Sequence, residues 1–255
     1  MDRAHDLASM SARHINRGFT MRALLLPSLM LALAACATTE PAADDFAYSA
    51  GTAWVAFDDG WDAEAEAVFA DATSFVQAFA EANPDAGWAV VLDLDETVMN
   101  NVEYQLRRER LGLGYTPESW YEWTQEESAT LVPGVEAFLE TVNTLGGHVA
   151  FVTNRSDSEQ LATENNLADL GLVRGDDFQV LMTRARPNGV SAKDERYALV
   201  SPLLAAQGYP DVEIIAYLGD NVGDKPETEG EWTFFCIDQG AMYGDPCAAV
   251  PGPGQ

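Results

Sequence analysis

VVLDLDET, residues 90–97, carries an apolar run directly into two aspartates, Asp93 and Asp95. The residues before Asp93 favour strands, and a short apolar run is typical of a central parallel strand that is covered on both faces. Ligands of open α/β sheets bind outside the carboxyl ends of such strands. Two carboxylates this close repel each other unless a cation lies between them or one of them holds a proton. The stretch therefore indicates a Mg²⁺ site, a nucleophile with an adjacent acid, or both. The alternative is a plain acidic turn in a chain that has 41 Asp and Glu residues.

Polar groups recur at later strand ends and at one helix start, and they favour the site over the acidic turn. In chain order they are Thr153-Asn154, Lys193, and Asp220 with Asp224. Each has a role in phosphoryl transfer: a carboxylate can act as nucleophile, a second acid can move protons, and a lysine stabilises the anionic transition state. Further carboxylates suit Mg²⁺, which prefers oxygen ligands.

The pattern of elements predicts an α/β fold with a doubly wound parallel sheet, because strand-like and helix-like segments alternate. An N-terminal helix is expected over 61–85 and the core over 86–250, with a small helical insertion at about 101–130 beside the crevice. The expected strands end at Asp93, or cover 148–152, 179–182, 213–218 and 232–237.

The N-terminus has the pattern of a targeting segment. Residues 1–35 combine basic residues, a short apolar run and small residues before Cys36, which is the arrangement of a signal peptide. Leu33-Ala34-Ala35-Cys36 resembles a bacterial lipobox, which implies a lipid on Cys36 and an anchor in the cell envelope, most simply at the outer membrane facing the periplasm. An ordinary signal peptide with an incidental cysteine is the alternative. Met21 is a second candidate start, and residues 36–60 are expected to form a tether.

Charge and histidine content exclude two classes of function. The chain carries 14 Lys and Arg residues against 41 Asp and Glu residues, and its net charge of −27 argues against a nucleic-acid polymer as partner. His5 and His14 lie in the leader, so His148 is the single histidine left for the mature chain. One histidine cannot build a His-rich zinc centre, so the chemistry depends on carboxylates, lysine and a hard metal.

The four motifs together resemble those of the haloacid dehalogenase superfamily. They are Asp93-Leu94-Asp95-Glu96-Thr97, Thr153-Asn154-Arg155, Lys193 and Gly219-Asp220-Asn221-Val222-Gly223-Asp224. The branch that is most similar is that of lipoprotein e and the class C acid phosphatases, also called four-aspartate phosphatases. The resemblance implies a Rossmann-like core and a Mg²⁺-dependent phosphatase that acts on small phosphomonoesters, including nucleoside 5′-monophosphates.

The resemblance also implies roles for individual residues. Asp93 is expected to be the nucleophile and a metal ligand, and Asp95 the general acid and base that offers Mg²⁺ its backbone carbonyl. Thr153, Asn154 and Lys193 are expected to bind the phosphoryl group. Asp220 and Asp224 are expected to complete the metal site.

Substrate-binding residues are expected among the aromatic side chains of the insertion and of the late Tyr-Gly-Asp stretch. The candidates are Trp120, Tyr121, Trp123 and Tyr243, although each has packing as its alternative role. A phosphotransferase, a phosphatase for sugar phosphates and a non-catalytic envelope lipoprotein with the same fold are the alternative functions. If Cys36 is lipidated, Cys236 and Cys247 remain as an even pair that is able to form a disulfide in an oxidising compartment.

Overall fold

The structure is a computed structural model that describes residues 46–185 and 189–247. The expected signal peptide, Cys36 and most of the expected tether lie outside the described residues, as does the end of the chain after Cys247. Within the described part, no helix combines the length and the apolar character that a membrane crossing needs.

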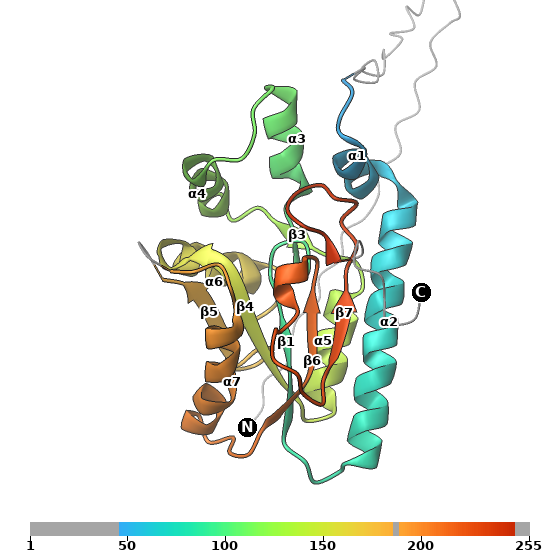
Figure 1. Cartoon of the computed structure of the whole chain (residues 1–255), viewed down its shortest axis with the longest axis vertical. Coiled ribbons are helices and arrows are strands. Elements are labelled where there is room, and N and C mark those ends of the chain that lie inside the picture. Colours follow the sequence, from blue (N-terminus) through green and yellow to red (C-terminus); the bar gives the residue numbers. More distant parts are fainter. Residues whose placement is uncertain (1–45, 186–188, 248–255) are drawn as a thin grey trace, which may run out of the picture. The chain divides into compact units, whose positions relative to one another are not determined.

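A five-stranded sheet in the order β5-β4-β1-β6-β7 forms the centre of the described chain (Figure 1). Each neighbouring pair of its strands is parallel, so all carboxyl ends lie along one edge. The α/β doubly wound fold that the sequence predicts is therefore confirmed. The strands are β1 (Trp88–Leu92), β4 (His148–Ser156), β5 (Val180–Arg184), β6 (Glu213–Gly219) and β7 (Thr233–Cys236).

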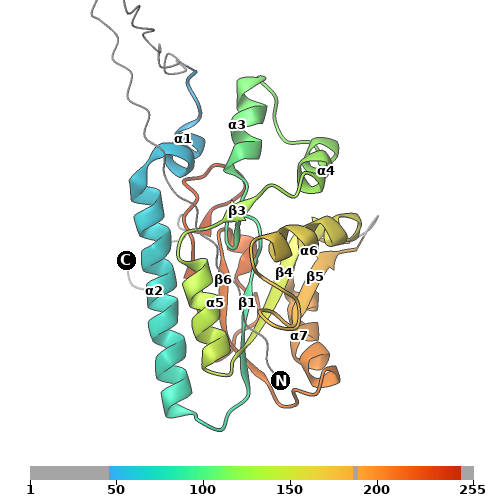
Figure 2. The same ribbon diagram turned by 180° about the vertical axis from the view of Figure 1, so that it is seen from behind.

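Helices cover both faces of the sheet, and each face buries its own apolar cluster. Val90 and Leu92 of β1 belong to the cluster that contains residues of α2, α5 and α6, whereas Ala89 and Val91 belong to the cluster of α7. Successive strand residues point to opposite faces, which explains why β1 is apolar throughout. The helices are α2 (Asp59–Ala82), α5 (Val135–Thr144), α6 (Gln160–Asp169) and α7 (Asp194–Ala206), and Figure 2 shows the first three from behind.

The expected insertion consists of two short helices beyond the carboxyl ends of the strands (Figure 1). They are α3 (Val102–Arg110) and α4 (Pro117–Gln125), and Thr116 caps α4 through a reciprocal capping box with Ser119. The insertion is closed by an antiparallel pair, β2 (Met99–Asn100) with β3 (Thr130–Leu131). Trp120 of α4 lines the same cavity as Asp93 and Asp95.

The expected tether over 36–60 is wrong for its last part, because α1 (Ala50–Phe57) is a packed helix. Ser49 caps it, and the hydroxyls of Ser49 and Thr52 donate to Glu109 Oε1 of α3 at 2.8 and 2.7 Å. A Cβ at Gly51 would lie 2.5 Å from the Gly240 carbonyl oxygen, so α1 also packs closely on the C-terminal loop. These partners lie far away in the sequence, and therefore local composition did not indicate the helix.

Candidate active site

Asp93 lies at the carboxyl end of β1, where its backbone N–H extends the sheet by donating to the Leu218 carbonyl at 2.9 Å. The chain then turns, because the N–H groups of Val98 and Met99 both donate to the Leu94 carbonyl at 2.8 Å. Glu96 adopts a left-handed conformation in this turn, with φ of 58°. The turn points Asp93 and Asp95 into one cavity of about 470 Å³.

Three carboxylates that the sequence predicts as metal ligands come together. Asp93, Asp220 and Asp224 each offer one oxygen, and these oxygens lie within 4.8 Å of one another. Asp220 and Asp224 come from the turn after β6, where Gly219 is required because a Cβ there would lie 2.2 Å from the Asp224 Cβ. Three hard oxygen donors at this spacing suit a divalent cation such as Mg²⁺.

Lys193 joins the cluster from the first residue before α7. Its Nζ donates to Asp93 Oδ1 and lies 2.6 Å from Asp224 Oδ1, and its side chain is buried. A lysine before a helix is usually solvated, whereas here the ammonium lies between two buried carboxylates. Although burial alone lowers the pKa of Lys193, Asp93 and Asp224 raise it above its ordinary value, so the amine is charged.

The cluster carries more negative charge than Lys193 neutralises. Burial raises the pKa of Asp93 to about 7 against the opposing effect of Lys193. Burial, followed by the charge of Asp224, raises the pKa of Asp220 well above its ordinary value. A carboxylate that is difficult to ionise alone is stabilised by a bound cation. The donor set therefore fits a divalent metal.

Asp95 is held by a network that the sequence did not reveal in full. Its Oδ1 accepts from Arg155 Nε and Nη2 at 2.9 and 2.7 Å and from Asn101 Nδ2 at 3.0 Å. The Asn101 side chain is oriented in turn by Trp123, whose Nε1 donates to Asn101 Oδ1 at 2.9 Å. Because these donors all meet Oδ1, they leave Oδ2 as the oxygen of Asp95 that is available for proton transfer.

The two residues of the Thr153-Asn154 motif differ in position. Asn154 is exposed and lines the cavity, whereas Thr153 is buried and its Oγ1 accepts from the Arg155 N–H at 3.0 Å. Arg196 of α7 ties this motif to the Lys193 side of the site. It donates to the Thr153 carbonyl, and its Nη2 donates to Asn154 Oδ1 at 2.7 Å. The phosphate-binding role of Thr153 stays a prediction.

The predicted aromatic residues separate into two groups. Trp120 and Tyr243 line the cavity, and Tyr115, which sequence reasoning did not select, lines it with them. Trp123 does not, because it is buried and holds Asn101. Tyr121 is 38% exposed and lines neither described cavity. Trp123 and Tyr121 thus do not line the cavity, and a substrate-binding role for these two residues stays a prediction.

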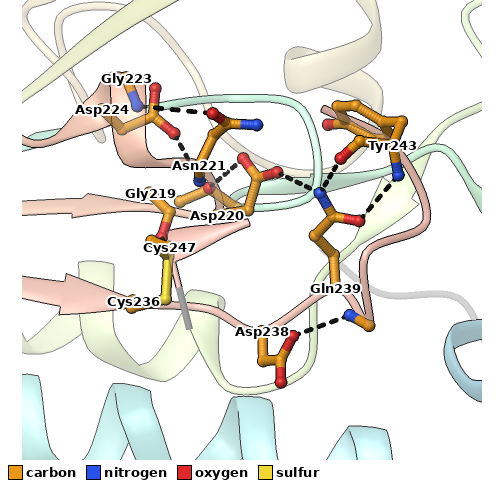
Figure 3. Close-up of a disulfide and its surroundings, with 12 residues drawn as sticks. Gly219, Asp220, Asn221, Gly223, Asp224, Cys236, Asp238, Gln239, Tyr243 and Cys247 are labelled. Atoms are coloured by element: carbon orange, nitrogen blue, oxygen red, sulfur yellow. Dashed lines mark hydrogen bonds between the residues drawn. A yellow bond between two sulfur atoms is a disulfide. The ribbon is translucent and has the colours of Figure 1, made fainter. Parts of the chain in front are cut away.

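The C-terminal loop contacts Asp220 of the carboxylate cluster, as Figure 3 shows. Gln239, which is buried, donates through Nε2 to Asp220 Oδ2 at 3.3 Å and to the Tyr243 carbonyl at 2.6 Å. Cys236 and Cys247 form a disulfide at the base of this loop. Nothing in the sequence around Gln239 marks it as a partner of Asp220.

Comparisons with known proteins agree with this geometry. Residues 47–246 match the model of a family described as HAD superfamily, subfamily IIIB (Acid phosphatase). A class C acid phosphatase from Bacillus anthracis with tungstate bound is similar in structure, with a TM-score of 0.65 and 23% identity over 76% of this chain and 84% of that chain. A second structure of the Bacillus anthracis class C acid phosphatase gives a TM-score of 0.64 with the same identity and coverage.

Proposed function

We propose a Mg²⁺-dependent reaction through an aspartyl-phosphate for this chain, which belongs to the acid phosphatases of HAD subfamily IIIB and is a phosphoric monoester hydrolase. The observation that carries the proposal is the contact of Lys193 with two carboxylates of the buried Asp93, Asp220 and Asp224 cluster. Mg²⁺ held by these carboxylates and the Asp95 carbonyl would neutralise charge on the phosphoryl group.

In the first step a carboxylate oxygen of Asp93 attacks phosphorus, and the bond from phosphorus to the leaving oxygen breaks. Asp95 gives that oxygen a proton from Oδ2, because Arg155 and Asn101 hold Oδ1. In the second step Asp95 takes a proton from water, whose oxygen attacks phosphorus and releases Asp93. Lys193 and the Asn154 amide hold the phosphoryl oxygens throughout.

The substrate is proposed to be a small phosphomonoester, with nucleoside 5′-monophosphates as one candidate class. Trp120 and Tyr115 support this, because their rings lie 6.3 Å apart on the cavity wall and offer apolar area to a leaving group. Sugar phosphates and transfer to a second alcohol are the competing possibilities. Three aromatic residues line the cavity, Tyr115, Trp120 and Tyr243.

Phosphate release by the purified full-length chain from nucleoside, aryl and sugar phosphates, with Mg²⁺ or with EDTA, tests the reaction. We expect release that requires Mg²⁺ and that falls by at least about 1,000-fold in Asp93→Asn, since the nucleophile is then lost. Glu122→Gln, an exposed change on α4, is the matched control. Full activity of Asp93→Asn, or release that is unaffected by EDTA, contradicts the mechanism.

The location is proposed to be the bacterial envelope, through a lipid on Cys36. The lipobox-like Leu33-Ala34-Ala35-Cys36 supports it, and so does the pair Cys236 and Cys247, since disulfides persist in oxidising compartments. Cell fractionation of the native chain and of Cys36→Ser checks the anchor. We expect the native chain in the membrane fraction and the variant outside it, and the same fraction for both argues against a lipid on this cysteine.

A further inference from the structure

Arg184 lies at the carboxyl end of the edge strand β5, on the same edge of the sheet as the reacting groups. Two strand spacings separate β5 from β1, which carries Asp93. Because neighbouring strands are about 4.8 Å apart, the ends of β1 and β5 are roughly 10 Å apart. The backbone of Arg184 therefore lies roughly 10 Å to one side of Asp93 along the carboxyl edge of the sheet.

Arg184 also marks the junction between two cavities. The active-site cavity of about 470 Å³ and a neighbouring cavity of about 360 Å³ share four lining residues, Arg184, Asn154, Trp120 and Tyr115. A phosphomonoester with its phosphoryl group at Asp93 has room to extend past Trp120 into the second cavity. Arg184 lines both cavities and so lies beside that path.

Arg184 differs from the other two cationic residues that line the active-site cavity, because both of those are paired with carboxylates. Lys193 is paired with Asp93 and Asp224, and Arg155 is paired with Asp95. Among the residues that the structure describes, Arg184 has no carboxylate partner, and its one hydrogen bond runs from Nη1 to Ser191 Oγ at 3.1 Å.

The carboxylate that lines the second cavity does not serve as that partner. Glu159 is buried, and its Oε2 accepts from the Ser156 N–H at 2.6 Å while its Oε1 accepts from Thr124 Oγ1 at 3.2 Å. An arginine presents several donors in one plane, which matches the oxygens of a carboxylate or phosphate. In a chain with a net charge of −27, such a guanidinium on a cavity wall is suited to an anionic ligand.

We propose that Arg184 forms a subsite for a second anionic group, a carboxylate or a phosphate, on the leaving group of the substrate. The preferred substrates are then phosphate esters of acidic alcohols, and Arg184 is the residue that determines this preference. The inference rests on the proposed placement of the phosphoryl group at Asp93.

Three esters test it with Mg²⁺ present: glycerol 3-phosphate, 3-phosphoglycerate, and the phosphate ester of 3-hydroxypropylphosphonate, whose second anion is not hydrolysable. The kcat/KM of each is measured for the native full-length chain, Arg184→Gln, Arg184→Lys and Arg174→Gln. Arg174 is the matched control, because it lines neither cavity and pairs with Glu164 at 2.7 Å. 4-Nitrophenyl phosphate serves as a reference for activity as such.

We expect Arg184→Gln to lose about tenfold to 100-fold more kcat/KM on the two doubly anionic esters than on glycerol 3-phosphate, mainly through KM. Arg184→Lys should recover part of the loss, and Arg174→Gln should not change the ratio. A preference for only one of the two esters identifies the second anion as carboxylate or phosphate and supports the subsite.

An equal loss of kcat/KM on all three esters overturns the inference, because Arg184 then contacts the transferred phosphoryl group. No loss on any ester also overturns it, because Arg184 then contacts no part of the substrate. The inference is also overturned if Arg174→Gln changes the ratio of kcat/KM between the doubly anionic esters and glycerol 3-phosphate. The loss of any positive charge then explains the preference. A native chain that hydrolyses 4-nitrophenyl phosphate but neither doubly anionic ester overturns the subsite alone. A native chain that hydrolyses nothing overturns the proposed function.

Discussion

Glu96 belongs to the Asp93–Thr97 motif and is buried, although the sequence suggests no role for it. Its side chain is buried, Oε1 accepts from the Asn101 N–H at 2.8 Å, and Oε2 accepts from the Tyr243 hydroxyl at 2.6 Å. Burial, followed by the charge of Asp95, raises the pKa of Glu96 to about 8. Glu96 therefore joins the turn after β1 to the C-terminal loop, and its protonation is linked to stability.

The linkage predicts how the stability of the metal-free protein depends on pH. Because the folded pKa is raised above the ordinary value of 4.5, unfolded Glu96 loses its proton between pH 4.5 and about 8 while folded Glu96 keeps it. The free energy of unfolding should therefore fall as pH rises through this window. Glu96→Gln should make the fall less steep without removing it, since Asp93 acts in the same direction.

Urea denaturation in EDTA at several pH values between 4.5 and 8 measures this slope. Glu122→Gln, which changes an exposed carboxylate on α4, should keep the native slope. Identical slopes for the native chain and Glu96→Gln would refute the assignment.

At the scale of elements, the C-terminal loop acts as a clamp on the turn that carries Asp220 and Asp224. The Cys247 N–H donates to the Asp220 carbonyl at 3.0 Å, and the Val222 N–H donates to the Asp245 carbonyl at 2.9 Å. The disulfide to Cys236 fixes the start and the end of this loop, as Figure 3 shows. Gln239 then reaches Asp220 from inside the loop.

We predict that Cys236→Ser/Cys247→Ser weakens both the fold and the metal site. The two cysteines are 11 residues apart, and closing a loop of that length contributes about 3 kcal/mol to the free energy of unfolding. The dissociation constant of Mg²⁺ should rise, because Asp220 loses part of its support. Chemical denaturation and titration calorimetry measure the two effects.

A reductant provides the matched control for this pair of cysteines. Dithiothreitol should weaken Mg²⁺ binding by the native chain and leave binding by the double variant as it is. Unchanged Mg²⁺ affinity in the double variant would show that the loop holds its position without the disulfide.

For the whole molecule, 41 acidic residues against 14 basic residues give a net negative charge that opposes the approach of an anionic substrate. The field of the chain repels an anionic phosphomonoester at long range, and salt screens this repulsion at distances beyond the Debye length of about 10 Å. Inside the cavity Lys193, the proposed cation and the proposed Arg184 subsite would act over short distances, where salt screens much less.

We therefore predict that kcat/KM for glycerol 3-phosphate rises a few-fold between about 10 mM and about 150 mM NaCl. The comparison is made at saturating Mg²⁺, so that the occupancy of the metal site stays constant. The effect should appear in KM more than in kcat, since screening acts on the approach of the substrate. A kcat/KM that falls with added salt would indicate that attraction within the cavity extends into the solvent.

The sequence by itself determined the α/β class, the acid phosphatase family and the set of residues that meet at the carboxyl edge of the sheet. Parallel strands bring their carboxyl ends to one edge, so Asp93, Asp220 and Asp224 were predictable as neighbours from strand-like runs that end in aspartate. Lys193 was predictable for a related reason, because lysine is so scarce in this acidic chain that its place in the pattern stands out.

Only the tertiary structure decided which side chains support these residues and which face the substrate. Gln239 contacts Asp220 across 19 residues of sequence and Arg196 contacts Asn154 across 42, and no local pattern marks such contacts. Asn101 is only six residues from Asp95, but its side chain is held by Trp123 of α4. Trp120 and Trp123 are three residues apart on α4, yet one lines the cavity and the other is buried against Asn101. The rotation of a short helix against its neighbours sets that difference, and it depends on packing between segments that the sequence does not place relative to one another.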